Sequence, residues 1–252
     1  HYSGSVNVSK GQWIPGAKGG YSCDFTRLKV QIVTEQNDGA DDTQPSQTSE
    51  VVPFEDVDAD TGMKVRGEAS ESGLHGLIQF IDTEDFLVQR ANYTDGKLHG
   101  LLERFDKGEK IFEQEFVDGL PHGLMRAFDR NNLVCEQYYA HGLQHGSCSL
   151  FAAGTLVRRC TYSAGRLHGE VTEYSSEGVL NRKENYNLGL KDGPQYIYWP
   201  DGNLLQKQDF ENGIATSETI QYSKSGKPVT NVENDEQGIL NTMMDLFVGE
   251  KK

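Results

Sequence analysis

The sequence predicts an all-β protein: an elongated single-layer antiparallel sheet of stacked β-hairpin repeats, followed by a short C-terminal helix. Three observations predict this fold. A His-Gly pair recurs at a nearly constant interval, aromatic residues recur in step with it, and 28 of the 252 residues are glycine. Glycine well above its usual ~7% is typical of chains with many tight turns between short strands.

The His-Gly pair defines a repeat of about 23 residues. Successive pairs are separated by 24, 23, 23 and 23 residues, and Asp192-Gly193 takes the same place one period later. One aromatic residue stands three positions before a glycine in each unit, and a second follows each His-Gly pair. The pairs begin at His75, His99, His122, His145 and His168.

Each unit reads as a β-hairpin, because it contains two extended runs separated by glycines that supply positive φ at turns. A helix is not expected, since two or three glycines per unit would each cost about 1 kcal/mol relative to alanine. Aromatic side chains in register would form ladders across hairpins, worth roughly 0.2–1 kcal/mol per pair. One hairpin alone is marginal, so neighbouring units must stabilise one another in a sheet about 60 Å long.

The repeats are assigned to residues 61–228, and three segments flank them. Residues 1–34 are interpreted as an N-terminal cap with one strand, which would cover an open sheet edge. Residues 35–60 carry nine Asp or Glu and no Lys or Arg, a composition typical of a solvated acidic linker; the alternative is an acidic contact for a basic partner. Val51–Phe54, before Gly62, and Met63–Glu68, after it, are a candidate for a degenerate first hairpin.

Residues 229–252 are predicted to contain the only helix. Asn234 or Asp235 would cap its N-terminus, and four apolar residues would share one face. The segment is interpreted as a cap on the last hairpin, with a docking helix for a partner as the alternative. The four residues of that face are Leu240, Met243, Met244 and Phe247.

The pattern Tyr-x-x-Gly-x-x-His-Gly, followed by a second aromatic and a further glycine, resembles the variant form of the MORN repeat. Residues 118–123 and 193–202 resemble two settings of this repeat: the N-terminal half of SET-domain lysine methyltransferases, and bacterial antitoxin or immunity proteins. The resemblance implies the fold. For function it leaves three alternatives: a non-enzymatic scaffold, which we favour, the targeting half of a methyltransferase, or an immunity protein.

The sequence does not predict catalysis, a metal or a cofactor. Equivalent histidines in neighbouring hairpins would lie about 9–10 Å apart, whereas zinc needs its ligands about 2 Å from one centre. His141 and His145, which flank one turn, are the only close pair expected. No glycine-rich phosphate loop, local signature of a nucleophile or SET-domain landmark resembling Asn-His-Ser-x-x-Pro-Asn occurs in the chain.

The predicted function is protein–protein interaction through an exposed sheet face. A net charge of −14 favours a basic protein partner and disfavours nucleic acid and anionic membrane surfaces, which are negatively charged themselves. The oligomeric state is left open. The candidate anchors are aromatic residues, with the alternative that they only form the core of the sheet: Tyr174, Tyr198, Trp199 and Tyr222.

Residue spacing predicts two further kinds of site. Cys148 and Cys160 bracket one turn, so they are expected to face each other and permit a disulfide; Cys135 is a competing partner, and buried free thiols are the alternative. Asn7 and Asn92 begin N-glycosylation sequons. The sequons favour a secreted or luminal setting over a cytoplasmic one.

Overall fold

The computed structural model describes residues 50–59 and 61–229, and the backbone alone of residues 5–9, 12–15, 21–24 and 29–33. The chain forms two compact units. Unit 1 comprises His1–Asn131 and Tyr139–Gly142, and unit 2 comprises Asn132–Tyr138 and Leu143–Lys252. The described part of the chain contains strands and no helix, which confirms the all-β class. The predicted helix within 229–252 lies outside the described residues.

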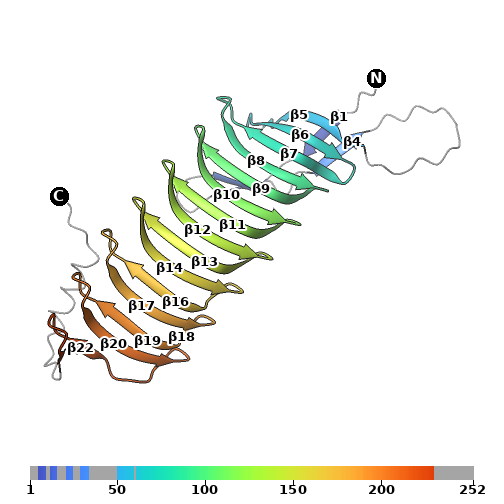
Figure 1. Cartoon of the computed structure of the whole chain (residues 1–252). Coiled ribbons are helices and arrows are strands. Elements are labelled where there is room, and N and C mark those ends of the chain that lie inside the picture. The colour runs from blue at the N-terminus through green and yellow to red at the C-terminus, as the bar shows by residue number, and fades with distance from the viewer. Residues whose placement is uncertain are drawn as a thin grey trace, which may run out of the picture. The chain divides into compact units, whose positions relative to one another are not determined.

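Unit 1 holds an antiparallel sheet in which strands that follow one another in sequence are hydrogen-bonded neighbours (Figure 1). The sheet begins nine residues before the predicted boundary at residue 61, because the first strand forms a hairpin with the second. Its strands are β5 (Val52–Val57), β6 (Lys64–Ser70), β7 (Gly73–Ile81), β8 (Leu87–Thr94), β9 (Lys97–Asp106), β10 (Glu109–Val117) and β11 (Leu120–Asp129).

Four short strands precede this sheet. β1 (Ser5–Ser9) pairs with β4 (Lys29–Val33), and β2 (Gln12–Pro15) pairs with β3 (Tyr21–Asp24), both antiparallel. β1 lies beside β5, and β4 lies beside β7.

Unit 2 continues the same pattern of antiparallel hairpins, so the prediction of stacked hairpin repeats is confirmed in both units. β12 (Asn132–Ala140) contributes residues to both units. The strands that follow are β13 (Leu143–Ala152), β14 (Thr155–Ser163), β15 (Arg166–Leu167), β16 (Gly169–Tyr174), β17 (Leu180–Asn187), β18 (Leu190–Lys191), β19 (Gly193–Tyr198), β20 (Leu204–Glu211), β21 (Ile214–Ala215), β22 (Ile220–Tyr222) and β23 (Pro228–Val229).

Two-residue turns with positive φ at both positions connect many of the strands. In the turn between β10 and β11, φ is +52° at Asp118 and +81° at Gly119. This is the type I′ geometry, whose twist matches that of paired strands. The turn glycine also donates its N–H to the preceding hairpin, for example from Gly119 to the Leu98 carbonyl at 2.8 Å. One turn in each period is therefore hydrogen-bonded to the hairpin before it.

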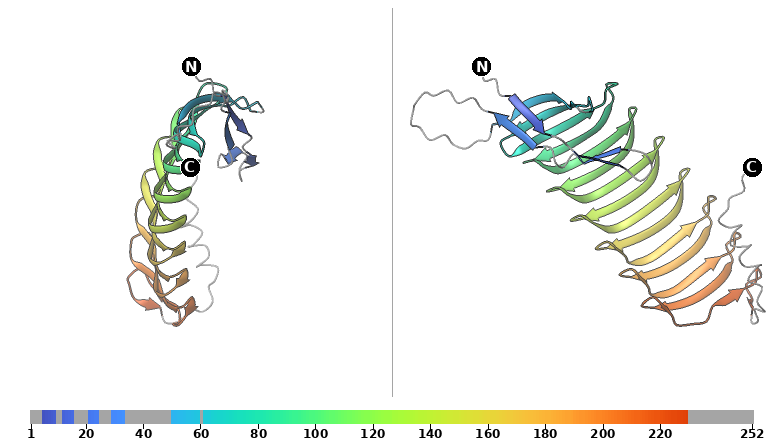
Figure 2. Two further views of the ribbon diagram at one scale, coloured as in Figure 1. Left: turned by 90° about the vertical axis from the view of Figure 1, so that its right-hand side faces the viewer. Right: turned by 180° about the vertical axis from the view of Figure 1, so that it is seen from behind.

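The His-Gly pair lies inside a strand, at a β-bulge. Phe116 pairs with Pro121 and Gln114 with Met125, so three residues of β11 stand opposite Glu115 alone. Gly123 has a φ of +71°, and a Cβ there would lie 2.1 Å from Glu115 Oε2. The expectation that this glycine forms a turn was wrong, because a bulge requires positive φ as well. The strands of both units are visibly bent (Figure 2).

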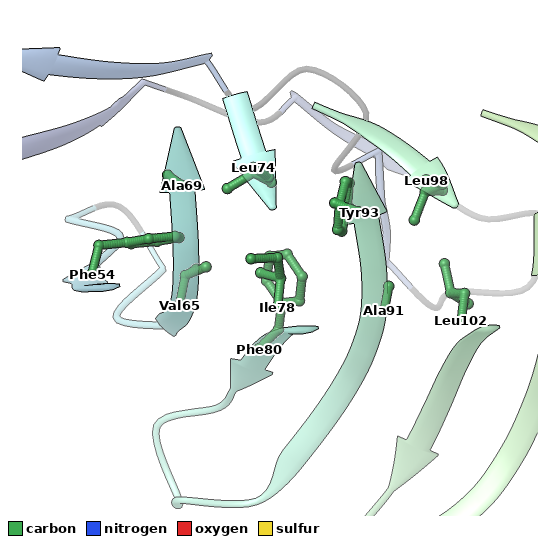
Figure 3. Packing of buried hydrophobic residues seen from close by; sticks show 10 residues of the cluster. All are labelled: Phe54, Val65, Ala69, Leu74, Ile78, Phe80, Ala91, Tyr93, Leu98 and Leu102. Carbon is green, nitrogen blue, oxygen red and sulfur yellow. The ribbon is translucent and has the colours of Figure 1, made fainter. Parts of the chain in front are cut away.

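The hydrophobic core of unit 1 is built from side chains of β5 to β9 that pack together (Figure 3). Ile78 and Phe80 on β7 are fully buried at its centre. Ten buried side chains form this core: Phe54, Val65, Ala69, Leu74, Ile78, Phe80, Ala91, Tyr93, Leu98 and Leu102.

Glu103 is a buried charge next to this core. Its side chain is 7% exposed and lies 2.6 Å from Lys110 Nζ, and it also accepts a hydrogen bond from Arg90. The bond from Arg90 and the one from Lys110 hold the pKa of the Glu103 carboxyl below its ordinary value, against the opposing effect of burial. Lys110 in turn lies 3.0 Å from Glu113, so the charges form a network across β8, β9 and β10.

Glu103→Gln is expected to lower the free energy of unfolding by about 2 kcal/mol at pH 7, because charge-assisted hydrogen bonds are lost. The folded-state pKa is depressed, so this stabilisation is present above the unfolded pKa of about 4.3 and is lost as pH falls through the folded value. Urea denaturation at pH 7 and pH 3 should therefore show the difference from wild type shrinking at pH 3. The exposed Glu109 is the control, and an equal effect of Glu109→Gln would contradict the prediction.

Candidate interaction surface

The four predicted aromatic anchors lie at one end of the strands of unit 2. Tyr174, Tyr198 and Tyr222 are the last residues of β16, β19 and β22, and Trp199 follows Tyr198. All four are half-buried. The Trp199 indole N–H donates to the Tyr222 carbonyl at 3.3 Å, and Lys224 Nζ lies 5.5 Å from the Trp199 ring centroid. The structure thus brings Trp199 and Tyr222 together, where they link neighbouring hairpins.

The most exposed large apolar side chains of unit 2 lie at its turns, and the sequence reasoning missed them. Leu143 is 51% exposed, and on two neighbouring turns further along the chain Leu188, Leu190 and Ile214 are 50%, 51% and 71% exposed. We call Leu188, Leu190 and Ile214 the apolar turn edge. A Cβ on Gly213 would lie 3.5 Å from Leu190 Cδ2, so Leu190 packs against the next turn, the one that carries Ile214. The available signal was an apolar residue directly beside a turn glycine.

Leu188 also has an unfavourable backbone conformation. It is the first residue of a type I′ turn, with a φ of +47°. Asn212 takes the equivalent place in the following turn, with a φ of +49°, and Asn, Asp and Gly are the residues that this position prefers. A leucine here is therefore neither the preferred turn residue nor a buried one.

Charged side chains of both signs surround the apolar turn edge, and the exposed Arg166 lies beside Gly189. Lys191 Nζ lies 3.0 Å from Glu184 Oε1, and Lys207 Nζ lies 3.4 Å from Asp209 Oδ2. Both lysines are thus paired. The exposed Glu211 and Glu218 lie on either side of Ile214 in the sequence and form no ion pair among the described residues.

The histidines contact residues of neighbouring repeats. His99 Nδ1 lies 3.5 Å from Asp118 Oδ1, and the His122 and His141 ring centroids are 5.4 Å apart. The close contact of His141 is therefore with His122 of the preceding repeat, and the expectation that His141 and His145 are the only close pair was wrong. No group of three or more His, Cys, Asp or Glu in the described segments is arranged to hold a metal ion.

The cysteines and sequons occupy ordered strands. Cys148 on β13 is the direct cross-strand partner of Cys160 on β14, and both are buried free thiols. Asn92 Nδ2, the atom that would carry a glycan, donates to the Leu101 carbonyl at 3.2 Å. Asn7 lies in β1.

Among the described residues, no helix has the length and hydrophobicity needed to cross a bilayer.

Comparison with known proteins agrees with this geometry. The family model of the MORN repeat variant matches residues 167–188 and 191–212, whereas no curated protein sequence matches the chain. Each matched segment ends immediately before a turn glycine, at Gly189 or Gly213, and spans one hairpin: β16 and β17, or β19 and β20. The match therefore has the period of the structural repeat, and residues 167–188 and 191–212 are two adjacent MORN repeats of the variant type.

Proposed function

We propose that this chain is a non-enzymatic scaffold that binds another protein through the apolar turn edge of unit 2. The observation that carries this proposal is the exposure of Leu188, Leu190 and Ile214 on neighbouring turns of a hydrogen-bonded sheet. Rigid, exposed apolar groups are the usual anchors of protein interfaces. The unpaired Glu211 and Glu218 favour a partner that presents basic residues beside its apolar ones.

The conformation of Leu188 supports the same surface. A left-handed backbone conformation costs roughly 1–2 kcal/mol for a residue with a Cβ, and less for Asn or Asp. An exposed leucine gains nothing from burial to offset this cost. Residues that depart from local preference without a folding benefit are concentrated at functional sites.

Leu188→Asn is expected to raise the free energy of unfolding of unit 2 by about 1 kcal/mol, because Asn suits the turn, and to weaken partner binding. Ala164→Asn is the matched control, since Ala164 occupies the same turn position with a φ of +47°. It should give a similar gain in stability with no change in binding. Hydrogen exchange of the flanking strands measures the stability of each turn.

Binding is tested by affinity capture from the native source with wild type, Ala164→Asn and the double variant Leu188→Asn, Ile214→Thr. A protein held by wild type and by Ala164→Asn, but retained at least about tenfold less by the double variant, supports the proposal. That weakening corresponds to about 1.4 kcal/mol. Reconstitution of the complex from the two purified proteins would complete the evidence. Equal capture by all three chains, or capture by none, would contradict a binding role for this edge.

A further inference from the structure

Unit 2 contains a row of three thiols on adjacent strands. Cys135 lies on β12, Cys148 on β13 and Cys160 on β14. Cys148 lies on the middle strand of the three, so it is the shared neighbour. Cys148 and Cys160 are 7% and 1% exposed, whereas Cys135 is half-buried and is the sulfur nearest to solvent.

The environment of the row favours the reactive form of its two outer sulfurs. The hydrogen bond with Cys148 lowers the pKa of Cys135 to about 7. It also lowers the pKa of Cys160 to about 6, with a further contribution from the Arg158 guanidinium. The same hydrogen bonds raise the pKa of Cys148. Since the thiolate is the nucleophile, Cys135 attacks the peroxide and Cys160 attacks in the final exchange, whereas Cys148 keeps its proton until the hydroxide leaving Cys135 takes it up.

We propose that these three cysteines form a thiol relay that is oxidised by hydrogen peroxide at Cys135 and ends in a Cys148–Cys160 disulfide. The proposal does not depend on the partner-binding role of the apolar turn edge. It assigns a reversible oxidation site to β12, β13 and β14.

The first two steps use the more accessible sulfur. The Cys135 thiolate attacks one oxygen of the peroxide, the O–O bond breaks, and the departing hydroxide takes up a proton to form water. Cys135 is then a sulfenic acid. The Cys148 sulfur attacks the Cys135 sulfur, an S–S bond forms, and the S–O bond breaks. The hydroxide released leaves as water with the proton of Cys148.

The third step is a thiol–disulfide exchange. The Cys160 thiolate attacks the Cys148 sulfur, the bond between Cys148 and Cys135 breaks, and Cys135 departs as a thiolate. In sum, two thiols are oxidised to a disulfide while one peroxide is reduced to two waters.

The strand register favours Cys148–Cys160 as the final bond. Direct cross-strand partners have Cβ atoms about 4.5–5.5 Å apart, close to the 3.5–4.5 Å of a disulfide, and Cys148 and Cys160 are such partners.

The experiment treats the full chain with hydrogen peroxide, alkylates the remaining thiols and maps the peptides by mass spectrometry. Cys23 is replaced by serine in every variant, so that only the three relay thiols react. Before alkylation, the chain with all three relay cysteines should become lighter by the mass of two hydrogen atoms. Its peptides should show Cys148 joined to Cys160 and Cys135 alkylated. Cys135→Ser should give the same bond at least about tenfold more slowly, because the accessible sulfur is missing.

Cys148→Ala serves as the second variant. It should form no disulfide among these cysteines, and its Cys135 sulfenic acid should react with dimedone. Circular dichroism confirms that each variant keeps its sheet. An unchanged oxidation rate in Cys135→Ser, a final bond between Cys135 and Cys148, or the absence of any bond in the wild-type relay would each overturn the proposal.

Discussion

Phe80→Ala is expected to lower the free energy of unfolding of unit 1 by about 3–5 kcal/mol. Phe80 is fully buried and packs beside Ile78 at the centre of the core of unit 1. The neighbouring side chains of the core are held by paired strands and can move only partly into the cavity. The loss combines the transfer of the ring to water with the cost of that cavity.

Hydrogen exchange of the amides of β6 to β9 measures this effect directly, because it reports the opening of unit 1 itself. Phe86→Ala is the control: Phe86 is a residue of the same type in the same unit but is 39% exposed. It should cost less than about 1 kcal/mol. If both substitutions destabilised β6 to β9 equally, Phe80 would not be the centre of the core.

Gly73→Ala is expected to cost about 3 kcal/mol, for two reasons. Its φ of +123° is a conformation that residues with a Cβ rarely adopt, and a Cβ there would lie 2.8 Å from Gly96 Cα in the next turn. The backbone of that turn would have to move, which would weaken the hydrogen bond from Gly96 N–H to the Leu74 carbonyl, now 3.0 Å long. Backbone strain of this kind costs of order 1–3 kcal/mol before the displaced hydrogen bond is included.

Gly108→Ala separates the two contributions. Gly108 has a φ of +86°, and a Cβ there would meet nothing within 4 Å, so only the conformational cost of about 1 kcal/mol applies. Urea denaturation of the two variants should show Gly73→Ala to be the more destabilised by about 2 kcal/mol. If both variants lost the same free energy of unfolding, the close approach of the two turns would not contribute to the cost of Gly73→Ala.

The repeat and its hairpins could be predicted from the sequence because both depend on spacing along one chain. The same spacing misled at the His-Gly pair. A type I′ turn and a β-bulge both require positive φ, so the glycine alone does not distinguish Gly119 in a turn from Gly123 in a bulge. Pairing with the neighbouring hairpin decides whether the strand ends at a glycine, as at Gly119, or continues through it, as at Gly123.

The candidate surface was harder to predict because exposure depends on register between repeats. The aromatic residues Tyr198 and Tyr222 recur regularly, which suggests importance, yet packing between hairpins leaves them half-buried. The contact of His122 with His141 and the exposure of Leu188 likewise arise between hairpins. A bulge changes which side chains share a face, so a simple alternation along each strand does not identify them.

The hydrogen bond that one turn glycine in each period donates to the hairpin before it has a consequence for how such a chain can change in length. Gly119 donates to Leu98, Gly142 to Pro121, and in unit 2 Gly189 to Leu167 and Gly213 to Lys191. Duplication or loss of one whole period would leave every remaining turn with a donor and an acceptor. Loss of a single residue within a strand would invert the faces of its side chains. The array is therefore expected to evolve by whole periods.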